Sequence, residues 1–196
     1  MITSTRSRIL DAALTLFLRK GVAATRIGEI CSKAGVSNGS LFHAFASKEA
    51  IAVALYVGAI GSYQSALLVE LSDSRAPGET LRALVFAHWR WIAHQEARAR
   101  FLFSQGGPGW NVEAEKQTAA LNTRMRAAFA AWLAAPQQRA AIRKVPEEAF
   151  LPIILGPSMM VTRFWLRTPD QPPPRQLAET FASAALRALL KGPDDE

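Results

Sequence analysis

The segment Ala34-Gly35-Val36-Ser37 ends one helical pattern of apolar residues and allows a second to begin at once. Gly35 suits a left-handed backbone turn, and the Ser37 hydroxyl can accept a hydrogen bond from the first free amides of a following helix. Apolar residues recur at three- and four-residue spacing on both sides, as the buried face of a helix requires. They are Ile27, Ile30, Cys31 and Ala34 before the turn, and Leu41, Ala44 and Phe45 after it. The pattern predicts two short helices joined by a tight turn.

One further helix is expected on each side of this pair. Residues 7–19 have amphipathic spacing and run into Gly21, which is expected to end the first helix. Thr25 is expected to cap the second helix. Another helix is predicted to start behind Ser47, with Lys48 in its first turn. Residues 1–55 are therefore expected to form a three-helix domain of the helix-turn-helix type.

The remainder, residues 56–196, shows helical patterns and no strand pattern or internal repeat. One helix is expected to open at Pro146 and to be kinked or split, since Pro152 and Pro157 each remove a backbone hydrogen bond. The sequence predicts an all-α fold of about nine helices, with a helical bundle as the second domain. Expected loops are Ser72–Gly78, Gln105–Gly109 and Pro169–Pro174. The last helix is expected to turn Leu177, Phe181, Ala184, Ala185, Ala188 and Leu189 inward.

The charge of the chain favours a polyanionic partner. Its formal net charge is +7, and the first 55 residues contain seven basic residues against three acidic ones. A solvated basic face without function would show the same excess. The chain has one cysteine, which excludes an internal disulfide, and no apolar run of the length that a membrane span needs. Without a signal-peptide pattern at its start, we expect a cytoplasmic protein that does not engage a membrane.

The sequence contains no constellation typical of an enzyme. Its three histidines, His43, His88 and His94, form no His-Glu-x-x-His motif, and no glycine-rich phosphate loop follows a strand. His88 and His94 are six residues apart, so they fall on different faces of a helix. We expect no catalytic residue, metal or cofactor.

The start of the third helix has the residue types that contact with nucleic acid requires. In a helix-turn-helix the second helix of the pair enters the major groove, and its N-terminal residues reach the base edges. The segment Ser37-Asn38-Gly39-Ser40 is small and polar, Asn38 can pair with an adenine edge or a phosphate, and His43 follows on the exposed side. Ser37 and Thr25 would also suit a purely structural role as helix caps.

The same residues resemble a known family. Arg8-Ile-Leu-Asp-Ala-Ala-Leu-Thr-Leu-Phe17, Gly21, Thr25, Ile30, Ala34-Gly-Val-Ser37, Gly39-Ser-Leu-Phe-His43, Phe45 and Ser47-Lys-Glu49 are similar to the N-terminal signature of the TetR/AcrR regulators. The resemblance covers about fifty residues and implies an all-helical homodimer that binds operator DNA. It also implies phosphate contacts from Thr25, Lys48 and a tyrosine whose position is occupied here by Phe42. The residues expected to bind DNA are Thr25, Arg26, Ser37, Asn38, Gly39, Ser40, Phe42, His43 and Lys48.

The second domain is expected to bind a small effector and a second copy of the chain. An effector pocket is concave and mainly apolar with few polar groups. The expected lining is Trp89, Phe101, Phe103, Met125 and Trp132, with His88 as a polar contact, although all six could instead fill the core. The homodimer is expected to form through the last two long helices, where Ala182, Ala184, Ala185 and Ala188 would allow close packing.

The sequence therefore predicts a ligand-responsive repressor that binds a palindromic operator as a homodimer and is released by a small apolar effector. The alternative is a helical ligand carrier or protein-binding module that has a helix-turn-helix but does not bind specific DNA. The polarity of Asn38, Ser40 and His43 favours the regulator.

Overall fold

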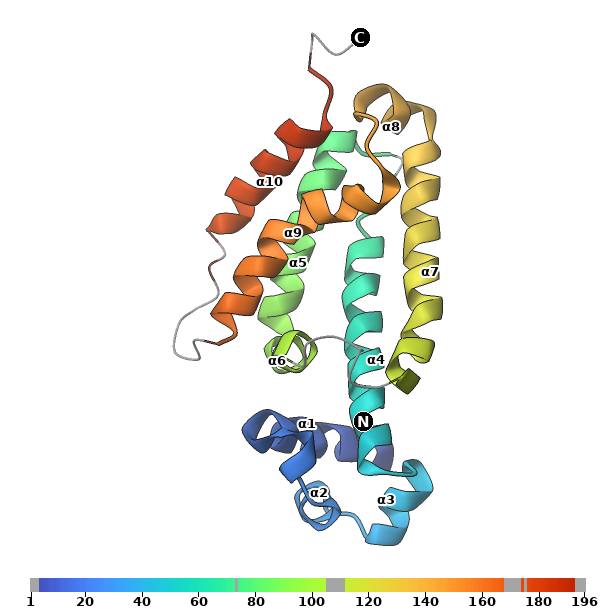
Figure 1. Ribbon diagram of the computed structural model, residues 1–196, viewed down its shortest axis with the longest axis vertical. Helices are drawn as coiled ribbons and strands as arrows, with labels where there is room; N and C mark the ends of the chain where they lie inside the picture. The colour runs from blue at the N-terminus through green and yellow to red at the C-terminus, as the bar shows by residue number, and fades with distance from the viewer. Residues whose placement is uncertain (1–3, 73, 105–111, 168–173, 175, 193–196) are drawn as a thin grey trace. The chain divides into compact units, whose positions relative to one another are not determined.

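The computed structural model describes residues 4–72, 74–104, 112–167, 174 and 176–192. Over these residues the chain forms ten helices and no strand, which confirms the predicted all-α fold (Figure 1). Pro136–Ala141 forms a short helix that the sequence did not predict, and a break at Gln95 separates two helices. The helices are α1 (Thr5–Ala24), α2 (Ile27–Ala34), α3 (Asn38–Ala44), α4 (Lys48–Leu68), α5 (Pro77–His94), α6 (Glu96–Ser104), α7 (Val112–Ala134), α8 (Pro136–Ala141), α9 (Glu147–Trp165) and α10 (Leu177–Leu189). The predicted loops at 105–109 and 169–174 lie largely outside the described residues.

The chain divides into two compact units. Unit 1 comprises Met1–Gly61 and Gln95–Ala119, and unit 2 comprises Ser62–His94 and Ala120–Glu196. Unit 1 thus contains the predicted helix-turn-helix domain together with α6 and the first part of α7. The boundaries fall within α4 and α7, so both helices contribute residues to both units.

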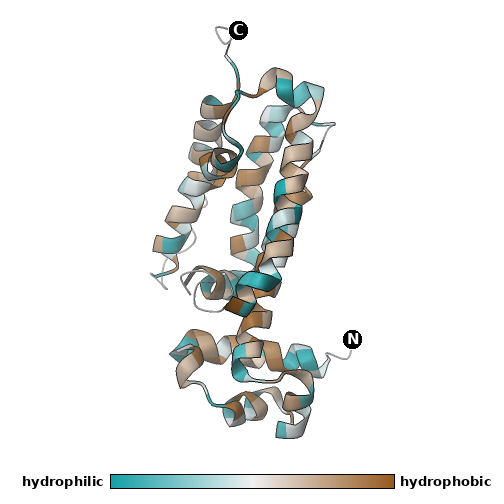
Figure 2. Ribbon diagram, turned by 45° about the vertical axis from the view of Figure 1, so that its right-hand side comes forward, coloured by the Kyte–Doolittle hydropathy of each residue, from teal (hydrophilic) through white to brown (hydrophobic). Residues whose placement is uncertain are grey.

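The core of unit 1 is built from the apolar stripes of its short helices. Ile9, Ile30 and Leu41, from α1, α2 and α3, have no exposed surface. Phe17 of α1 stacks on Phe101 of α6, with ring centroids 6.1 Å apart. Figure 2 shows hydrophobic and hydrophilic residues alternating along these helices, as expected when one side of each is buried.

Gly21 and Gly35 adopt the backbone conformations that glycine favours. Gly21 has φ +81° inside α1, so the regular helix is interrupted there as predicted, although helical residues continue to Ala24. Gly35 lies in the left-handed region at φ +62° and ψ +44° directly after α2. The predicted turn is confirmed.

Thr25 does not cap α2, so that prediction was wrong. The N-cap residue is Arg26, and its backbone N–H donates to the Glu29 carboxylate at 2.8 Å. The Thr25 hydroxyl instead donates to Gly21 O at 2.8 Å, four residues earlier in the chain. A threonine hydroxyl can either accept from the next helix or donate to the preceding turn, and residue type alone does not decide between them.

In unit 2, α5, α9 and α10 lie side by side and pack against one another (Figure 1). The predicted inner face of α5, including Leu84, Val85 and Ile92, is fully buried. Of the two predicted outcomes, a kink or a split, the split does not occur: α9 is one helix with Pro152 and Pro157 inside it. Both prolines lie on its exposed side, where water can solvate the carbonyl groups that lack a backbone donor.

The predicted inner face of α10 was partly wrong. The buried residues are Ala178, Ala182, Ala185 and Leu189, whereas Ala184 and Ala188 are exposed. Apolar residues occupy two neighbouring stripes of this helix, and spacing alone cannot decide which stripe faces the core. Ala184 and Ala188 are thus left on the outer surface.

Among the residues described, α4 is the helix whose length and composition would allow it to cross a membrane. Its most apolar stretch has a mean hydropathy of 1.5, and half of that stretch is buried inside the protein. The core helix of a soluble protein has the same properties.

Candidate nucleic-acid interface

The turn between α2 and α3 is held by a guanidinium group. Arg8 of α1 donates from Nε to Ala34 O at 3.0 Å and from Nη2 to the same oxygen at 2.6 Å, and Nη2 also donates to Gly35 O. These carbonyls belong to the end of α2, where the helix dipole favours a cation. Arg8 therefore fixes α1 against the turn that orients α3.

The other end of α3 is tied to α1 in a similar way. The Arg6 Nη1 group donates to Ala44 O at 3.0 Å, and the guanidinium lies 4.1 Å from the centroid of the Phe45 ring. A cation over an aromatic face is attracted by the ring quadrupole. Arginines from α1 thus hold both the turn before α3 and the C-terminal end of α3.

Held in this way, α3 presents a mixed face to solvent. Leu41 is completely buried, whereas Asn38, Gly39, Ser40 and His43 are exposed. Phe42 is 53% exposed, which is unusual for a phenylalanine and leaves its ring available to a partner. The predicted recognition residues of α3 therefore share one accessible surface.

Ser37 caps α3 as predicted. Its hydroxyl oxygen accepts from the Ser40 backbone N–H at 3.1 Å, and the two hydroxyl groups are 3.0 Å apart. This cap stabilises the helix end that a nucleic acid would approach.

Two residues expected to contact phosphate are engaged within the protein. Thr25 is 2% exposed, and its hydroxyl is used by Gly21. The Lys48 ammonium donates to Ala23 O at 2.9 Å and to Thr25 O at 3.0 Å, which ties α4 to the end of α1. An ammonium has three donors, so one donor of Lys48 remains for another acceptor.

The start of α2 is held by an ion pair within unit 1. Lys20 Nζ lies 2.5 Å from the Glu29 carboxylate. The hydrogen bond from Lys20, followed by that from the Arg26 backbone, lowers the pKa of Glu29. Arg26 itself is exposed beside this pair.

In unit 2, a buried histidine connects three helices. His88 of α5 is fully buried; its Nδ1 lies 2.9 Å from the Tyr63 hydroxyl, and its Nε2 lies 2.9 Å from the Thr162 hydroxyl. Burial lowers the pKa of His88 to about 4. A neutral imidazole has one donor and one acceptor, and the Ser158 backbone also forms a hydrogen bond with this ring.

Comparison with known proteins shows which regulators the chain resembles. Residues 9–55 match the family of bacterial regulatory proteins called the tetR family. The transcriptional repressor KstR2 of Mycobacterium tuberculosis is 35% identical over 98 residues, which are 50% of this chain and 48% of KstR2. KstR2 of Rhodococcus jostii is 40% identical over 91 residues, covering 44% and 43% of the two chains. The chain spans about half the length of the curated relatives it matches.

The similarity of fold extends over nearly the whole chain. The TetR family regulator PfmR of Thermus thermophilus superposes with a TM-score of 0.71 at 26% identity, covering 97% of this chain and all of PfmR. The fatty acid degradation regulator FadR of Bacillus halodurans gives a TM-score of 0.78 at 16% identity, covering both chains completely. Residues 9–55 thus match the tetR family, and the fold of the chain is similar to that of the TetR family regulator PfmR. Its relatives are transcriptional regulators and not enzymes.

The predicted DNA-binding residues of α3 are all exposed in unit 1. The predicted effector residues are divided between the two units, with Phe101 and Phe103 in unit 1 and the other four in unit 2. Trp132 is buried near Phe150, with ring centroids 6.3 Å apart, and Met125 is also buried. Trp89 packs edge-on against His88 at 5.3 Å. The sequence offered no way to separate these environments, since an apolar stripe looks the same in either unit.

Arg6 and the structural role of Arg8 were missed by the sequence reasoning. Both lie in the first turn of α1 and act on residues 26 to 39 positions further along the chain. The positive end of the helix dipole lies at the start of a helix, where a basic residue is unfavourable. Two arginines at the start of α1 were therefore the signal in the sequence that these side chains bind a group elsewhere in the protein.

Proposed function

We propose that this protein is a transcriptional regulator that reads operator DNA through α3. The observation that carries the proposal is the exposure of Asn38, Ser40 and His43 on α3, a helix whose preceding turn and C-terminal end are held by arginines. Rigid placement matters because base-edge hydrogen bonds tolerate little error in position. The family match over residues 9–55 supports the same function.

Each residue of this face has a chemical role in the major groove. The Asn38 amide can form a paired hydrogen bond with an adenine edge, while Ser40 and His43 can bind base edges or phosphates. Phe42 has no hydroxyl with which to bind phosphate, but its exposed ring can contact a thymine methyl group. Ser37, Gly39 and Arg26 are also exposed in unit 1, and the remaining donor of Lys48 can bind a phosphate.

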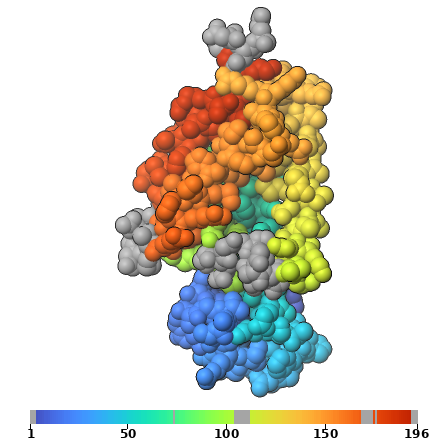
Figure 3. Space-filling model, in the orientation of Figure 1, coloured from blue at the N-terminus to red at the C-terminus, as the bar shows by residue number. Residues whose placement is uncertain are grey.

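The functional form is a homodimer that assembles through α9 and α10. Met160 and Phe164 are 61% and 63% exposed on one side of α9, four residues apart and therefore on the same stripe. Ala184 and Ala188 are exposed on α10. Figure 3 shows α9 and α10 side by side at the surface on the face in view. Large apolar side chains beside small ones would allow α9 and α10 of one chain to pack against α9 and α10 of a second copy. A dimer with two-fold symmetry would read a palindromic operator.

The protein acts as a repressor released by a small, mainly apolar effector bound in unit 2. Two similar proteins are named repressors, and a FadR of Bacillus subtilis with the same fold, at a TM-score of 0.74, was solved in complex with stearoyl-CoA. Among the sequence-predicted contacts, Trp89 offers a buried indole N–H without a hydrogen-bond partner in the described part of the chain. An effector acts by binding one arrangement of the dimer more tightly than the other.

The test is binding to the DNA upstream of the protein's own gene, compared with a scrambled duplex of equal length, at roughly 50 and 200 mM salt. Selective binding that persists at the higher salt is expected, with affinity falling as salt rises. Equal affinity for both duplexes, repeated on a selection of genomic fragments, would favour a helical carrier or protein-binding module instead.

A further inference from the structure

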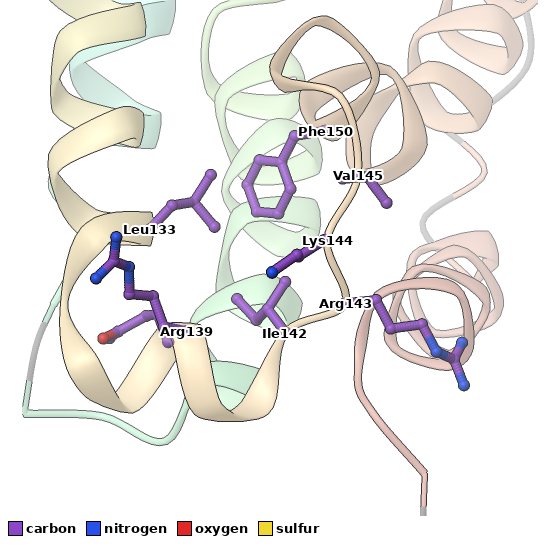
Figure 4. Close-up of a pocket in the computed structure, with 8 residues that line it drawn as sticks. Leu133, Arg139, Ile142, Arg143, Lys144, Val145 and Phe150 are labelled. Atoms are coloured by element: carbon purple, nitrogen blue, oxygen red, sulfur yellow. The ribbon is translucent and has the colours of Figure 1, made fainter. Parts of the chain in front are cut away.

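Unit 2 contains a hollow of about 350 Å³, which is formed by the end of α7, by α8 and by the segment leading into α9 (Figure 4). We call it the Gln138 hollow. Four of its lining residues are apolar, four are polar or basic, and none of these eight is acidic. They are Leu133, Ile142, Val145 and Phe150, and Gln138, Arg139, Arg143 and Lys144. This lining combines an apolar wall with positive charge.

Gln138 is the unusual member of this lining. It is only 1% exposed, and neither Nε2 nor Oε1 of its amide has a hydrogen-bond partner in the described part of the chain. Buried amides are almost always paired, because leaving them unpaired costs stability. The side chain therefore requires one group that accepts a hydrogen bond and one that donates.

The basic residues of the hollow differ in their availability. Arg143 donates to Arg187 O at 2.8 Å and to Ala188 O at 3.2 Å, and Figure 4 shows it pointing away from the other residues. Lys144 instead extends between Ile142 and Phe150, and Arg139 lies beside Leu133. Lys144 and Arg139 thus supply positive charge to the hollow.

A second hollow of about 390 Å³ adjoins the first, and the two share Leu133 and Phe150. Phe129, Leu151 and Pro152 extend its apolar wall, while Glu147 and Glu148 line it together with Arg126. The two glutamates disfavour an anion there. An anionic group would be placed in the Gln138 hollow, with an apolar chain running along Phe150 toward the second hollow.

We propose that the Gln138 hollow binds an amphipathic carboxylate that also carries a hydroxyl or amide N–H donor. The carboxylate would pair with Lys144 and Arg139 and accept from Gln138 Nε2, and the donor of the ligand would bind Gln138 Oε1. The apolar chain would cover Phe150 and Leu133. That this ligand acts as the effector rests on the proposed function; its binding does not.

The test is titration calorimetry of the full chain with three probes of equal length: 3-hydroxyoctanoate, octanoate and 1-octanol. The hydroxy acid is expected to bind most tightly and octanoate roughly fivefold to tenfold more weakly, since it lacks one hydrogen bond to a buried group. Octanol lacks the charge and is expected to bind more weakly still.

Two variants identify the contacts, and one serves as control. Gln138→Leu should reduce hydroxy acid binding to the level of octanoate or below, and Lys144→Gln should weaken both acids by roughly tenfold, the loss of one charged hydrogen bond. Gln137→Leu makes the same substitution at the exposed neighbouring position and should bind all three probes like the wild type. Circular dichroism verifies that each variant is folded.

The inference is wrong if no acid binds, or if Gln138→Leu and Lys144→Gln bind the acids as tightly as the Gln137→Leu control. Both results are independent of DNA. A chain that binds the hydroxy acid but no specific DNA would retain this site and lose the proposed function.

Discussion

At the scale of single residues, His88 gives unit 2 a defined dependence on pH. Its pKa is about 4 in the folded protein against an ordinary value of 6.5, so the unfolded chain binds the proton more readily. Stability is therefore fully present above about pH 6.5 and is lost as the pH falls toward 4. Between pH 7.5 and 4.5 this residue should remove about 2.5 kcal/mol from the free energy of unfolding.

Urea unfolding of the wild type and of His88→Gln at the two pH values measures this contribution. The glutamine variant should lose less stability on acidification, because the side chain at position 88 then has no group that takes up a proton in this range. His94 is exposed, and His94→Gln should behave like the wild type. The same acid sensitivity in His88→Gln and in the wild type would show that His88 is not the group responsible.

The unpaired amide of Gln138 carries a second prediction at this scale. Gln138→Leu removes a buried polar group that has no partner among the described residues, and it should raise the free energy of unfolding by about 1 to 3 kcal/mol in the absence of ligand. Gln137→Leu should leave it nearly unchanged. A destabilised Gln138→Leu variant would indicate that the amide is already satisfied in the free protein.

At the scale of elements, the turn before α3 depends on the backbone of Gly35. Its φ of +62° is strained for any residue with a Cβ, and an added Cβ would lie 3.1 Å from Arg8 Nη2. Gly35→Ala should therefore lower the free energy of unfolding by about 1 to 2 kcal/mol. Gly28 lies inside α2 with no neighbour within 4 Å of an added Cβ. Gly28→Ala should therefore raise the free energy of unfolding by about 0.5 to 1 kcal/mol. Thermal unfolding of both variants tests the contrast, and a neutral Gly35→Ala would contradict it.

The exposed side of α9 that contains Met160 and Phe164 allows a prediction about assembly. Met160→Glu with Phe164→Glu places two charges on the proposed dimer surface and should shift the protein to a monomer in sedimentation velocity. Val69 is 74% exposed outside this stripe, and Val69→Glu should remain dimeric. A double variant with the sedimentation coefficient of the wild type would exclude this surface.

Elements were predictable from the sequence wherever a local rule decides them. The turn at Gly35, the cap at Ser37 and the buried face of α5 depend on residue type and spacing within a few positions, and the structure confirms them. The inward stripe of α10 and the separation of Phe101 from Trp89 depend on contacts between distant segments. Arg8 was visible as a residue, but its partners lie 26 and 27 positions away. Local patterns contain no information about such pairings.

At the scale of the whole molecule, the protein divides into a unit that contains the helix-turn-helix, together with residues 95–119, and a second helical unit. The anchoring of α3 by Arg6 and Arg8 belongs to unit 1, and the His88 connection and the Gln138 hollow belong to unit 2. The proposed regulator requires both: one unit supplies the DNA-reading surface, and the other supplies the binding sites for a second copy and an effector.

The most direct test of the regulator is the affinity of the wild type and of the triple variant Asn38→Ala, Ser40→Ala, His43→Ala for a selected operator and for a scrambled duplex. The wild type is predicted to prefer the operator by roughly a thousandfold or more at physiological salt. The triple variant should lose most of that preference and keep its weak affinity for the scrambled duplex, since α3 supplies base contacts and the basic surface supplies phosphate contacts. Unchanged operator affinity in the triple variant would contradict the reading of DNA through α3.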